Sequence, residues 1–128
     1  MRMEIVFAAE PIVIPQCTLN SQETGACVEF QGIVRRTEGN TQLAALQYEA
    51  YIPMARRELE RIFVELNDAH PTHAVLFIHR LGRVPVGEAS LFIRVLSAHR
   101  GEGLAFCGAA IDRMKQDVPI WKVRAVPA

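Results

Sequence analysis

The sequence is short of lysine and cysteine, and it has no excess of charge of either sign. Its 128 residues include 14 basic and 14 acidic side chains, so the formal net charge is zero. General nucleic-acid binders and membrane-surface binders normally have a basic excess, and the charge balance argues against both classes. No apolar run approaches the roughly 20 residues that span a bilayer. We therefore expect neither nucleic acid nor a membrane as a partner.

The three cysteines, Cys17, Cys27 and Cys107, are odd in number and far apart, and no Cys-x-x-Cys spacing occurs. This pattern predicts neither a disulfide framework nor a zinc site, and we expect no metal and no cofactor. Acidic residues and proline interrupt the apolar N-terminal stretch, which favours a strand over a signal peptide. A reduced, cytoplasmic protein is the expectation.

The length and the hydrophobic fraction of 50% fit a single domain, residues 1–128. Alternation of apolar and polar residues predicts strands at 3–8, 26–34, 43–51, 74–80, 90–98 and 120–126. Helical spacing predicts two helices, at 53–68 and 102–117. The mixed order indicates an α+β fold, with the helices packed on a mainly antiparallel sheet.

Finer features follow from the same patterns. The polar loop with Gly39-Asn40 at its tip predicts a hairpin between strands 26–34 and 43–51. Residues 81–88 are expected to form a turn region. The first helix should bury Ala55, Leu59, Ile62, Phe63 and Leu66, and the second Leu104, Cys107, Ile111 and Met114.

Lys115 and Lys122 are the only lysines in the chain. A lysine amine can lose its proton near neutral pH when burial or neighbouring cations lower its pKa, whereas arginine stays charged. The pair is therefore a candidate for acid–base chemistry, and chance placement is the alternative. The two amines converge only if the chain folds back at Val118-Pro119. Otherwise Lys115 forms an ordinary ion pair with Asp112, and Lys122 is an exposed strand residue.

Three further candidates could bind an anion. His99 and Arg100 lie where a strand gives way to the second helix, and free backbone N–H groups at a helix start favour anions. Arg100 can grip a phosphate in a fork-like geometry, whereas an ordinary strand-end histidine is the alternative for His99. Arg35 opens the polar loop, where adjacent arginines are usually just solvated.

Five segments occur together in an order and spacing typical of one family: FQGIVR, YEAYIPMA, HRLGRVPVGE, SAHR and MKQDVPIWK. Through them, residues 25–122 resemble the large, catalytic subunit of molybdopterin synthase. The resemblance implies an α/β-hammerhead fold with an additional antiparallel β-sheet, and a homodimer. It also implies that each large subunit binds one small ubiquitin-like sulfur-carrier subunit with a Gly-Gly C-terminus, giving a heterotetramer.

The activity that the resemblance implies is a sulfurtransferase reaction in molybdenum cofactor biosynthesis. Sulfur passes from the thiocarboxylated C-terminus of the small subunit to cyclic pyranopterin monophosphate, forming the dithiolene of molybdopterin without a metal. Lys115 matches the family's catalytic lysine, and Lys122 matches a second lysine of its pocket. Arg35, His99 and Arg100 match substrate-binding positions, and the last two are expected to reach across from the partner subunit.

Departures from the family pattern leave a second interpretation open. After the Trp-Lys pair the family usually has a basic residue and then glutamate. Val123 and Arg124 stand here instead, so no acidic partner is expected for the lysines. Gly103-Leu104 replaces the usual Ala-Phe, and the chain stops at Ala128, short of the usual tail. The alternative is a non-catalytic or weakly active paralogue that binds the ubiquitin-like partner or a pterin phosphate without turnover.

Overall fold

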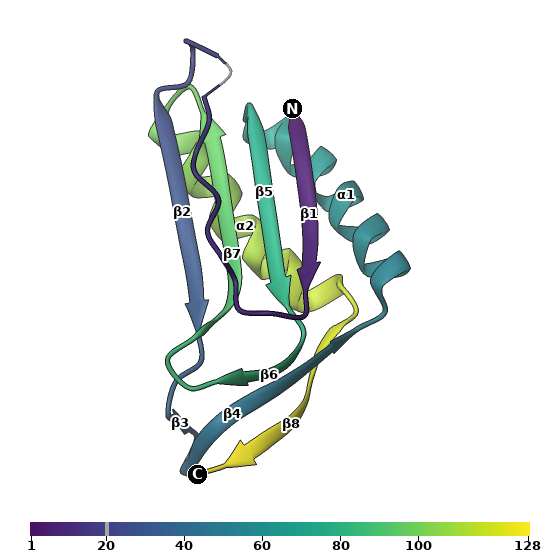
Figure 1. The fold of residues 1–128 in the computed structure, drawn as a ribbon. Coiled ribbons are helices and arrows are strands. Elements are labelled where there is room, and N and C mark those ends of the chain that lie inside the picture. Colours follow the sequence, from purple (N-terminus) through teal and green to yellow (C-terminus); the bar gives the residue numbers. More distant parts are fainter. Residues whose placement is uncertain (20) are drawn as a thin grey trace.

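The computed structural model describes residues 1–19 and 21–128, which form two sheets and two helices (Figure 1). In chain order the elements are β1 (Arg2–Ala8), β2 (Ala26–Ile33), β3 (Thr37–Glu38), β4 (Thr41–Ala50), α1 (Ile52–Ala69), β5 (Ala74–Arg80), β6 (Gly82–Pro85), β7 (Ala89–Ser97), α2 (Arg100–Asp117) and β8 (Ile120–Pro127).

The first sheet has the strand order β1-β5-β7-β2. Strands β1 and β5 are parallel, and the other neighbours are antiparallel. Both helices cover one face, while the segment after β1 crosses the opposite face (Figure 1). Arg94 on β7 holds that segment, because its Nη2 donates a hydrogen bond of 2.6 Å to the Pro15 carbonyl. The predicted α+β architecture with a mainly antiparallel sheet is confirmed.

The second sheet is built around β4, which pairs antiparallel with β3, β6 and β8. It lies at the end of the first sheet where β1, β2 and β5 terminate (Figure 1). It has its own small core, made by Val34, Leu43, Leu46, Tyr48 and Val84. A helix-covered sheet with a second antiparallel sheet at its end agrees with the hammerhead architecture that the resemblance implied.

The predicted hairpin between residues 26–34 and 43–51 is wrong. Strand β2 pairs with β7, and β4 belongs to the other sheet. The chain changes direction at Val34, whose backbone N–H donates to the Glu88 carbonyl and whose carbonyl accepts from Gly87 N–H. These two bonds end the pairing of β2. The turn at Gly39, with a φ of 61°, instead joins the short strand β3 to β4.

Helix α1 follows the predicted pattern. Its buried residues are the five that the spacing indicated, Ala55, Leu59, Ile62, Phe63 and Leu66. They pack against strands of the first sheet and form the main hydrophobic core with residues from α2. Arg61 on the outer face bridges Glu58 and Glu65 at 2.7 Å each, which fits a solvated charged face.

Helix α2 differs from the prediction in the residue at which it begins and in the set of residues that it buries. It begins at Arg100, two residues earlier than expected, and Leu104 is 59% exposed. The buried stripe is Gly103, Phe106, Cys107, Ala110 and Met114. The helix approaches the sheet at Gly103, where an added Cβ would lie 2.7 Å from Ser97 Oγ and 3.1 Å from Val28 Cγ2. That close approach sets the phase, and a hydrophobic periodicity argument misses it because glycine adds no apolar side chain.

Strand β6 lies in the region that was expected to be a turn. Its four residues pair with β4, and Val84 inserts into the core of the second sheet. Gly82 begins the strand and Gly87 follows it, with φ values of 85° and 88°, a conformation that glycine adopts without strain. The glycines correctly predict sharp changes of chain direction. The strand was missed because four residues are too few to show an alternating pattern.

The close approach at Gly103 predicts that Gly103→Ala destabilises the protein. The new methyl group would displace Ser97 Oγ, which is fully buried and donates to the His99 carbonyl at 2.7 Å. Overpacking and the lost hydrogen bond should outweigh the helix-propensity gain of alanine and lower the unfolding free energy by about 1–2 kcal/mol.

Gly108→Ala is the matched control in the same helix, because its Cβ would meet nothing within 4 Å. It should raise stability by about 0.5–1 kcal/mol. Urea titrations of both variants measure the two changes. Equal stabilisation by both substitutions would contradict the packing described at Gly103.

Candidate functional site

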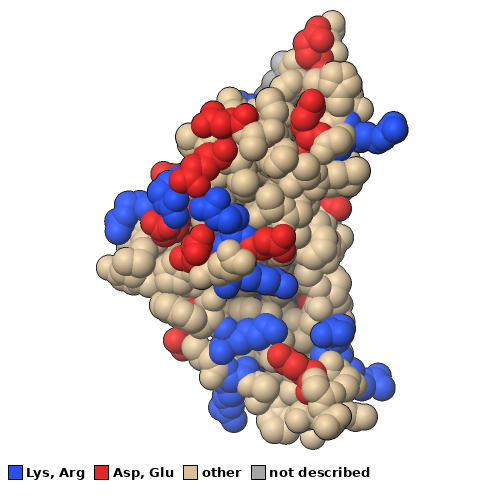
Figure 2. Space-filling model, turned by 180° about the vertical axis from the view of Figure 1, so that it is seen from behind, with Lys and Arg blue, Asp and Glu red and all other residues tan. Residues whose placement is uncertain are grey.

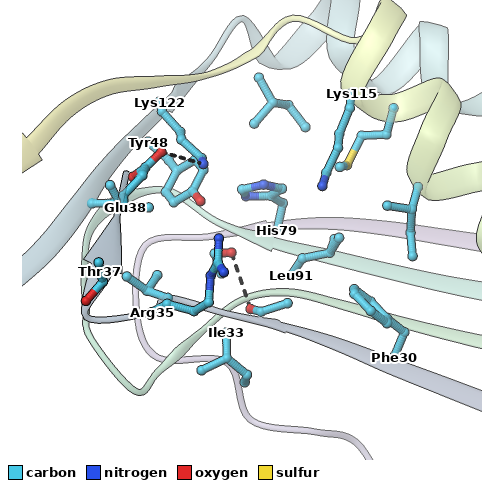
Figure 3. A pocket seen from close by; sticks show the side chains of 17 residues that line it. Phe30, Ile33, Arg35, Thr37, Glu38, Tyr48, His79, Leu91, Lys115 and Lys122 are labelled. Carbon is cyan, nitrogen blue, oxygen red and sulfur yellow. Dashed lines mark hydrogen bonds and ion pairs between the residues drawn. The ribbon is translucent and has the colours of Figure 1, made fainter. Parts of the chain in front are cut away.

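A cavity of about 390 Å³ opens where the two sheets meet the C-terminal end of α2 (Figure 3). The strand ends, the loop between β2 and β3 and the last turn of α2 supply its walls. Its lining residues are Phe30, Gly32, Ile33, Val34, Arg35, Thr37, Glu38, Leu46, Tyr48, His79, Ser90, Leu91, Ile111, Met114, Lys115, Ile120 and Lys122. This pocket mixes apolar walls with a few charged groups, as small-molecule sites usually do.

The structure brings Lys115 and Lys122 into this one pocket (Figure 3). Helix α2 ends at Asp117, and the chain turns back through Val118 and Pro119 into β8. Two hydrogen bonds hold the reversal: Val118 N–H donates to the Met114 carbonyl at 3.1 Å, and Tyr51 N–H donates to the Pro119 carbonyl at 3.2 Å.

The two lysines differ in their partners. Among the described residues, Lys115 has no hydrogen bond or ion pair, so the alternative pairing with Asp112 is not formed. Lys122 Nζ lies 3.4 Å from Glu38 Oε1 on β3, with both side chains about half exposed. The expectation that the lysines lack an acidic partner is therefore wrong for Lys122. An exposed pair of this kind contributes little to stability and leaves the amine available to a ligand.

Arg35 follows β2 and enters the same hollow, with its guanidinium below His79 (Figure 3). Arg35, Lys115 and Lys122 give the pocket three cationic side chains against the single carboxylate of Glu38. Basic side chains also predominate toward the second sheet at the lower end of the molecule, whereas both signs mix over the helix face (Figure 2). The pocket is therefore electrostatically suited to an anion.

His79 lies in the wall of the pocket and was not among the candidates from the sequence. It is 3% exposed, and its Nδ1 lies 2.8 Å from the Arg80 carbonyl. Burial lowers the pKa of His79 below its usual value, and the hydrogen bond to that carbonyl opposes the shift only in part. The ring is neutral at pH 7. Its position at the end of β5, before Arg80 and Gly82, is the sequence signal that could have found it.

His99 and Arg100 do not line the pocket. They begin α2, whereas Lys115 ends it, and fifteen residues of helix separate Arg100 from Lys115 by about 22 Å. His99 is 82% exposed, and its backbone N–H donates to Glu102 Oε2 at 3.3 Å. Within one chain these residues cannot meet the lysines. Their contribution from a partner subunit stays a prediction.

The surroundings of Cys27 and Cys107 do not activate their thiols as nucleophiles. Burial raises the pKa of the Cys107 thiol, and burial together with Cys17 raises that of Cys27. Both shifts favour the protonated thiol over the reactive thiolate. In the described part of the chain, no group of three or more His, Cys, Asp or Glu side chains could hold a metal ion. No helix of the described residues is long and apolar enough to cross a bilayer.

Comparison with known proteins identifies the family. The family model described as MoaE protein matches residues 7–117. The chain belongs to the MoaE family. It is 45% identical over 105 residues to a molybdopterin synthase catalytic subunit of Arabidopsis thaliana, covering 81% of this chain and 52% of that protein. It is 41% identical over 124 residues to the protein of that name in Staphylococcus carnosus, covering 94% and 81% respectively.

This MoaE-family chain therefore spans about half the length of the plant relative, and it spans 64% of the human one, to which it is 39% identical. A solved structure, the molybdopterin synthase of Staphylococcus aureus, matches with a TM-score of 0.85 and 34% identity over 96% of this chain and 90% of that one. A complex of subunits 1 and 2 of the Helicobacter pylori molybdopterin-converting factor shares the fold, with a TM-score of 0.65 and 22% identity.

The lowered pKa of His79 predicts a pH dependence of stability. As the pH falls, the unfolded chain protonates this histidine near pH 6.5, whereas the folded chain protonates it only at a lower pH. The unfolding free energy is therefore unaffected by protonation of this histidine above about pH 6.5. It falls progressively below that pH, because a proton binds the unfolded chain more readily than the folded one. Relative to His79→Gln, wild type should lose unfolding free energy between pH 7.5 and 5.5, by at most about 1.4 kcal/mol, the limit for one proton that binds only the unfolded chain. Urea titrations at several pH values check this, and parallel pH curves for the two proteins would contradict it.

Proposed function

We propose that this chain is the catalytic subunit of a molybdopterin synthase. It transfers sulfur from the thiocarboxylated C-terminus of a small ubiquitin-like subunit to cyclic pyranopterin monophosphate. The product is molybdopterin, in which the two transferred sulfurs form the dithiolene. The observation that carries the proposal is the convergence of Lys115, Lys122 and Arg35 in one cavity. The names of the relatives and the similarity over nearly the whole chain to the Staphylococcus aureus enzyme support it.

The charge of the pocket suits both reactants. The pterin substrate carries a cyclic phosphate, and the sulfur donor ends in a thiocarboxylate, so each presents a negative group. Three cationic side chains around a volume of about 390 Å³ would attract both groups and hold them close together. The apolar walls, including Phe30, Leu91 and Met114, give the flat pterin rings a surface to contact.

The two lysines take different roles in this proposal. Lys115 has no partner among the described residues, so its amine is available as the general acid and base of the reaction. As a general acid it protonates the oxygen that leaves when a C–S bond to the thiocarboxylate sulfur replaces a C–O bond of the substrate carbon. As a general base it then activates the water that cleaves the acyl–sulfur bond, which leaves the sulfur on the substrate and an ordinary carboxylate on the small subunit. Lys122, paired with Glu38, holds the thiocarboxylate or the phosphate by charge.

The proposed assembly is a homodimer of this chain that binds one small subunit per copy, a heterotetramer. The Helicobacter pylori structure is a complex of two different subunits, which supports a second protein as partner. In the dimer, His99 and Arg100 of one copy would complete the substrate site of the other. Free cysteines fit work in the cytoplasm, where thiols stay reduced. Residues 1–128 act as one domain, a proposal supported by Ile120, which packs against both core clusters.

Reconstitution tests the proposed function. The protein is mixed with thiocarboxylated small subunit and cyclic pyranopterin monophosphate, and molybdopterin is measured. Wild type should form product, and Lys115→Ala should lose at least about 100-fold in rate, the usual contribution of a general acid or base. The variant should keep its dimer, because Lys115 is exposed and lies outside the core.

The outcomes separate the two interpretations. Complex formation without any product would reject catalysis and favour the binding paralogue. Normal turnover by Lys115→Ala would reject the role of that lysine while leaving the activity itself standing.

A second substitution tests whether Lys122 acts only by charge. Lys122→Arg keeps the positive charge and the pairing with Glu38 but cannot deprotonate at neutral pH. The variant should keep most of the wild-type activity, within about fivefold, because a clamp needs charge and not titration. The rate of sulfur transfer by Lys122→Ala gives the reference for a lost clamp. An arginine variant as slow as the alanine variant would show that Lys122 moves a proton.

A further inference from the structure

His79 is a buried polar side chain that the acid–base roles of the lysines leave unexplained. It comes from β5, the strand whose neighbours are β1 and β7, and it is paired in register with Phe7 and Leu91. The ring lies in the pocket wall between Lys115 and the side chains of Arg35 and Tyr48 (Figure 3). Burial to 3% exposure removes most of the hydration of this imidazole, and the fold alone does not explain why a polar ring is placed there.

The hydrogen bond of His79 fixes its tautomer. Its Nδ1 lies 2.8 Å from the Arg80 carbonyl oxygen, which can only accept, so Nδ1 carries the hydrogen. A neutral ring then has an unprotonated Nε2 with a lone pair. In the described part of the chain Nε2 has no hydrogen-bond partner, so this acceptor is left for something in the cavity.

Aromatic contacts hold the ring in place. Tyr48 packs edge-on against it with ring centroids 5.1 Å apart, and the centroid of the tilted Phe77 ring lies 6.3 Å away. With Nδ1 bonded to the Arg80 carbonyl and two aromatic rings in contact, a flip of the imidazole would break that hydrogen bond and disturb the packing. The direction of the acceptor is therefore built into the fold.

Burial lowers the pKa of His79 and keeps the ring neutral at pH 7. The charged groups that line the same cavity are Arg35, Lys115, Lys122 and Glu38, and the Glu38 carboxylate is engaged by Lys122. Arg80 lies next along β5 and pairs with Glu88 at 2.7 Å. When an anionic group of a ligand binds the cationic side chains, the unprotonated Nε2 is left to accept a hydrogen bond from a neutral donor of the same ligand.

We propose that His79 is a specificity-determining residue whose Nε2 accepts a hydrogen bond from an N–H donor on the pterin rings of the substrate, while the cationic side chains bind its phosphate. This inference rests on the proposed function. It explains how one pocket recognises both ends of the ligand: a phosphate satisfies the cations, and a ring donor satisfies Nε2. A phosphate compound without a ring N–H would leave a buried acceptor unpaired and bind more weakly.

The tautomer is tested first and needs no activity. Two-dimensional ¹H–¹⁵N spectra of the imidazole rings distinguish Nδ1–H from Nε2–H, and His79→Gln identifies the signals of residue 79 among the four histidines. The expected result is an Nδ1–H ring whose pKa lies below the usual histidine value of 6.5. An Nε2–H ring, or a ring that titrates near pH 6.5, would overturn the proposal.

Two substitutions then separate the two ring nitrogens. His79→Asn keeps a donor near the position of Nδ1, for the Arg80 carbonyl, and removes the acceptor. His79→Gln keeps an acceptor oxygen near the position of Nε2. His79→Asn should raise the dissociation constant for cyclic pyranopterin monophosphate and its KM about tenfold, with kcat within about threefold of wild type. His79→Gln should stay within about threefold of wild type in both constants.

Controls make each outcome decisive. Binding of inorganic phosphate to the same proteins should not change, because the cations are intact. Equal affinity of His79→Asn and wild type for the pterin phosphate would overturn the inference and leave the proposed function standing. Equal weakening by Asn and Gln, or weakened phosphate binding, would assign His79 a purely structural role. Failure of wild type to bind the pterin phosphate at all would overturn the proposed function and this inference together.

Discussion

The reversal of the chain at Val118-Pro119 is the constraint on which the site depends. It stops α2 and starts β8 within three residues, and the Tyr51–Pro119 hydrogen bond ties it to the start of α1. Ile120, the next residue, packs against both core clusters and so joins the two sheets. Because this junction is held from both sides, the end of α2 and the first residues of β8 face one cavity. Two lysines seven residues apart therefore share a pocket that neither element could form alone.

The pocket combines two electrostatic environments that need each other. Its cations lie at exposed positions, where water limits the cost of placing like charges together. Its one histidine is buried, where charge would be costly and a neutral acceptor is stable. Glu38 lowers the repulsion at the rim by pairing with Lys122. A ligand with an anionic group at one end and a neutral hydrogen-bond donor at the other would match both environments. The proposed substrate, a pterin phosphate, is a ligand of this kind.

The sequence predicts the elements in which a periodic pattern shows which residues are buried. It does not predict contacts between segments that are far apart in the chain. The apolar stripe of α1 and the extent of β5 follow from spacing alone. The phase of α2 does not, because Gly103 fits against Ser97 by lacking a side chain. The pairing of β2 with β7 joins residues far apart in the chain, such as Ala26 and Ser97, and no residue type encodes it. Glu38 and Lys122 lie 84 positions apart, so their ion pair could not be seen before the strands were assembled.

Helix α2 also explains why the proposed site needs two copies of the chain. A rigid helix of 18 residues holds its first and last turns apart, and no side-chain rotation closes a gap of about 22 Å. If His99 and Arg100 bind the same substrate as Lys115, they must come from a different molecule. The exposure of Arg35, Lys115 and Lys122 in the single chain points the same way, because a further wall would reduce the bulk water around these cations and strengthen their attraction to an anion. Activity and assembly are thereby linked through the length of one helix.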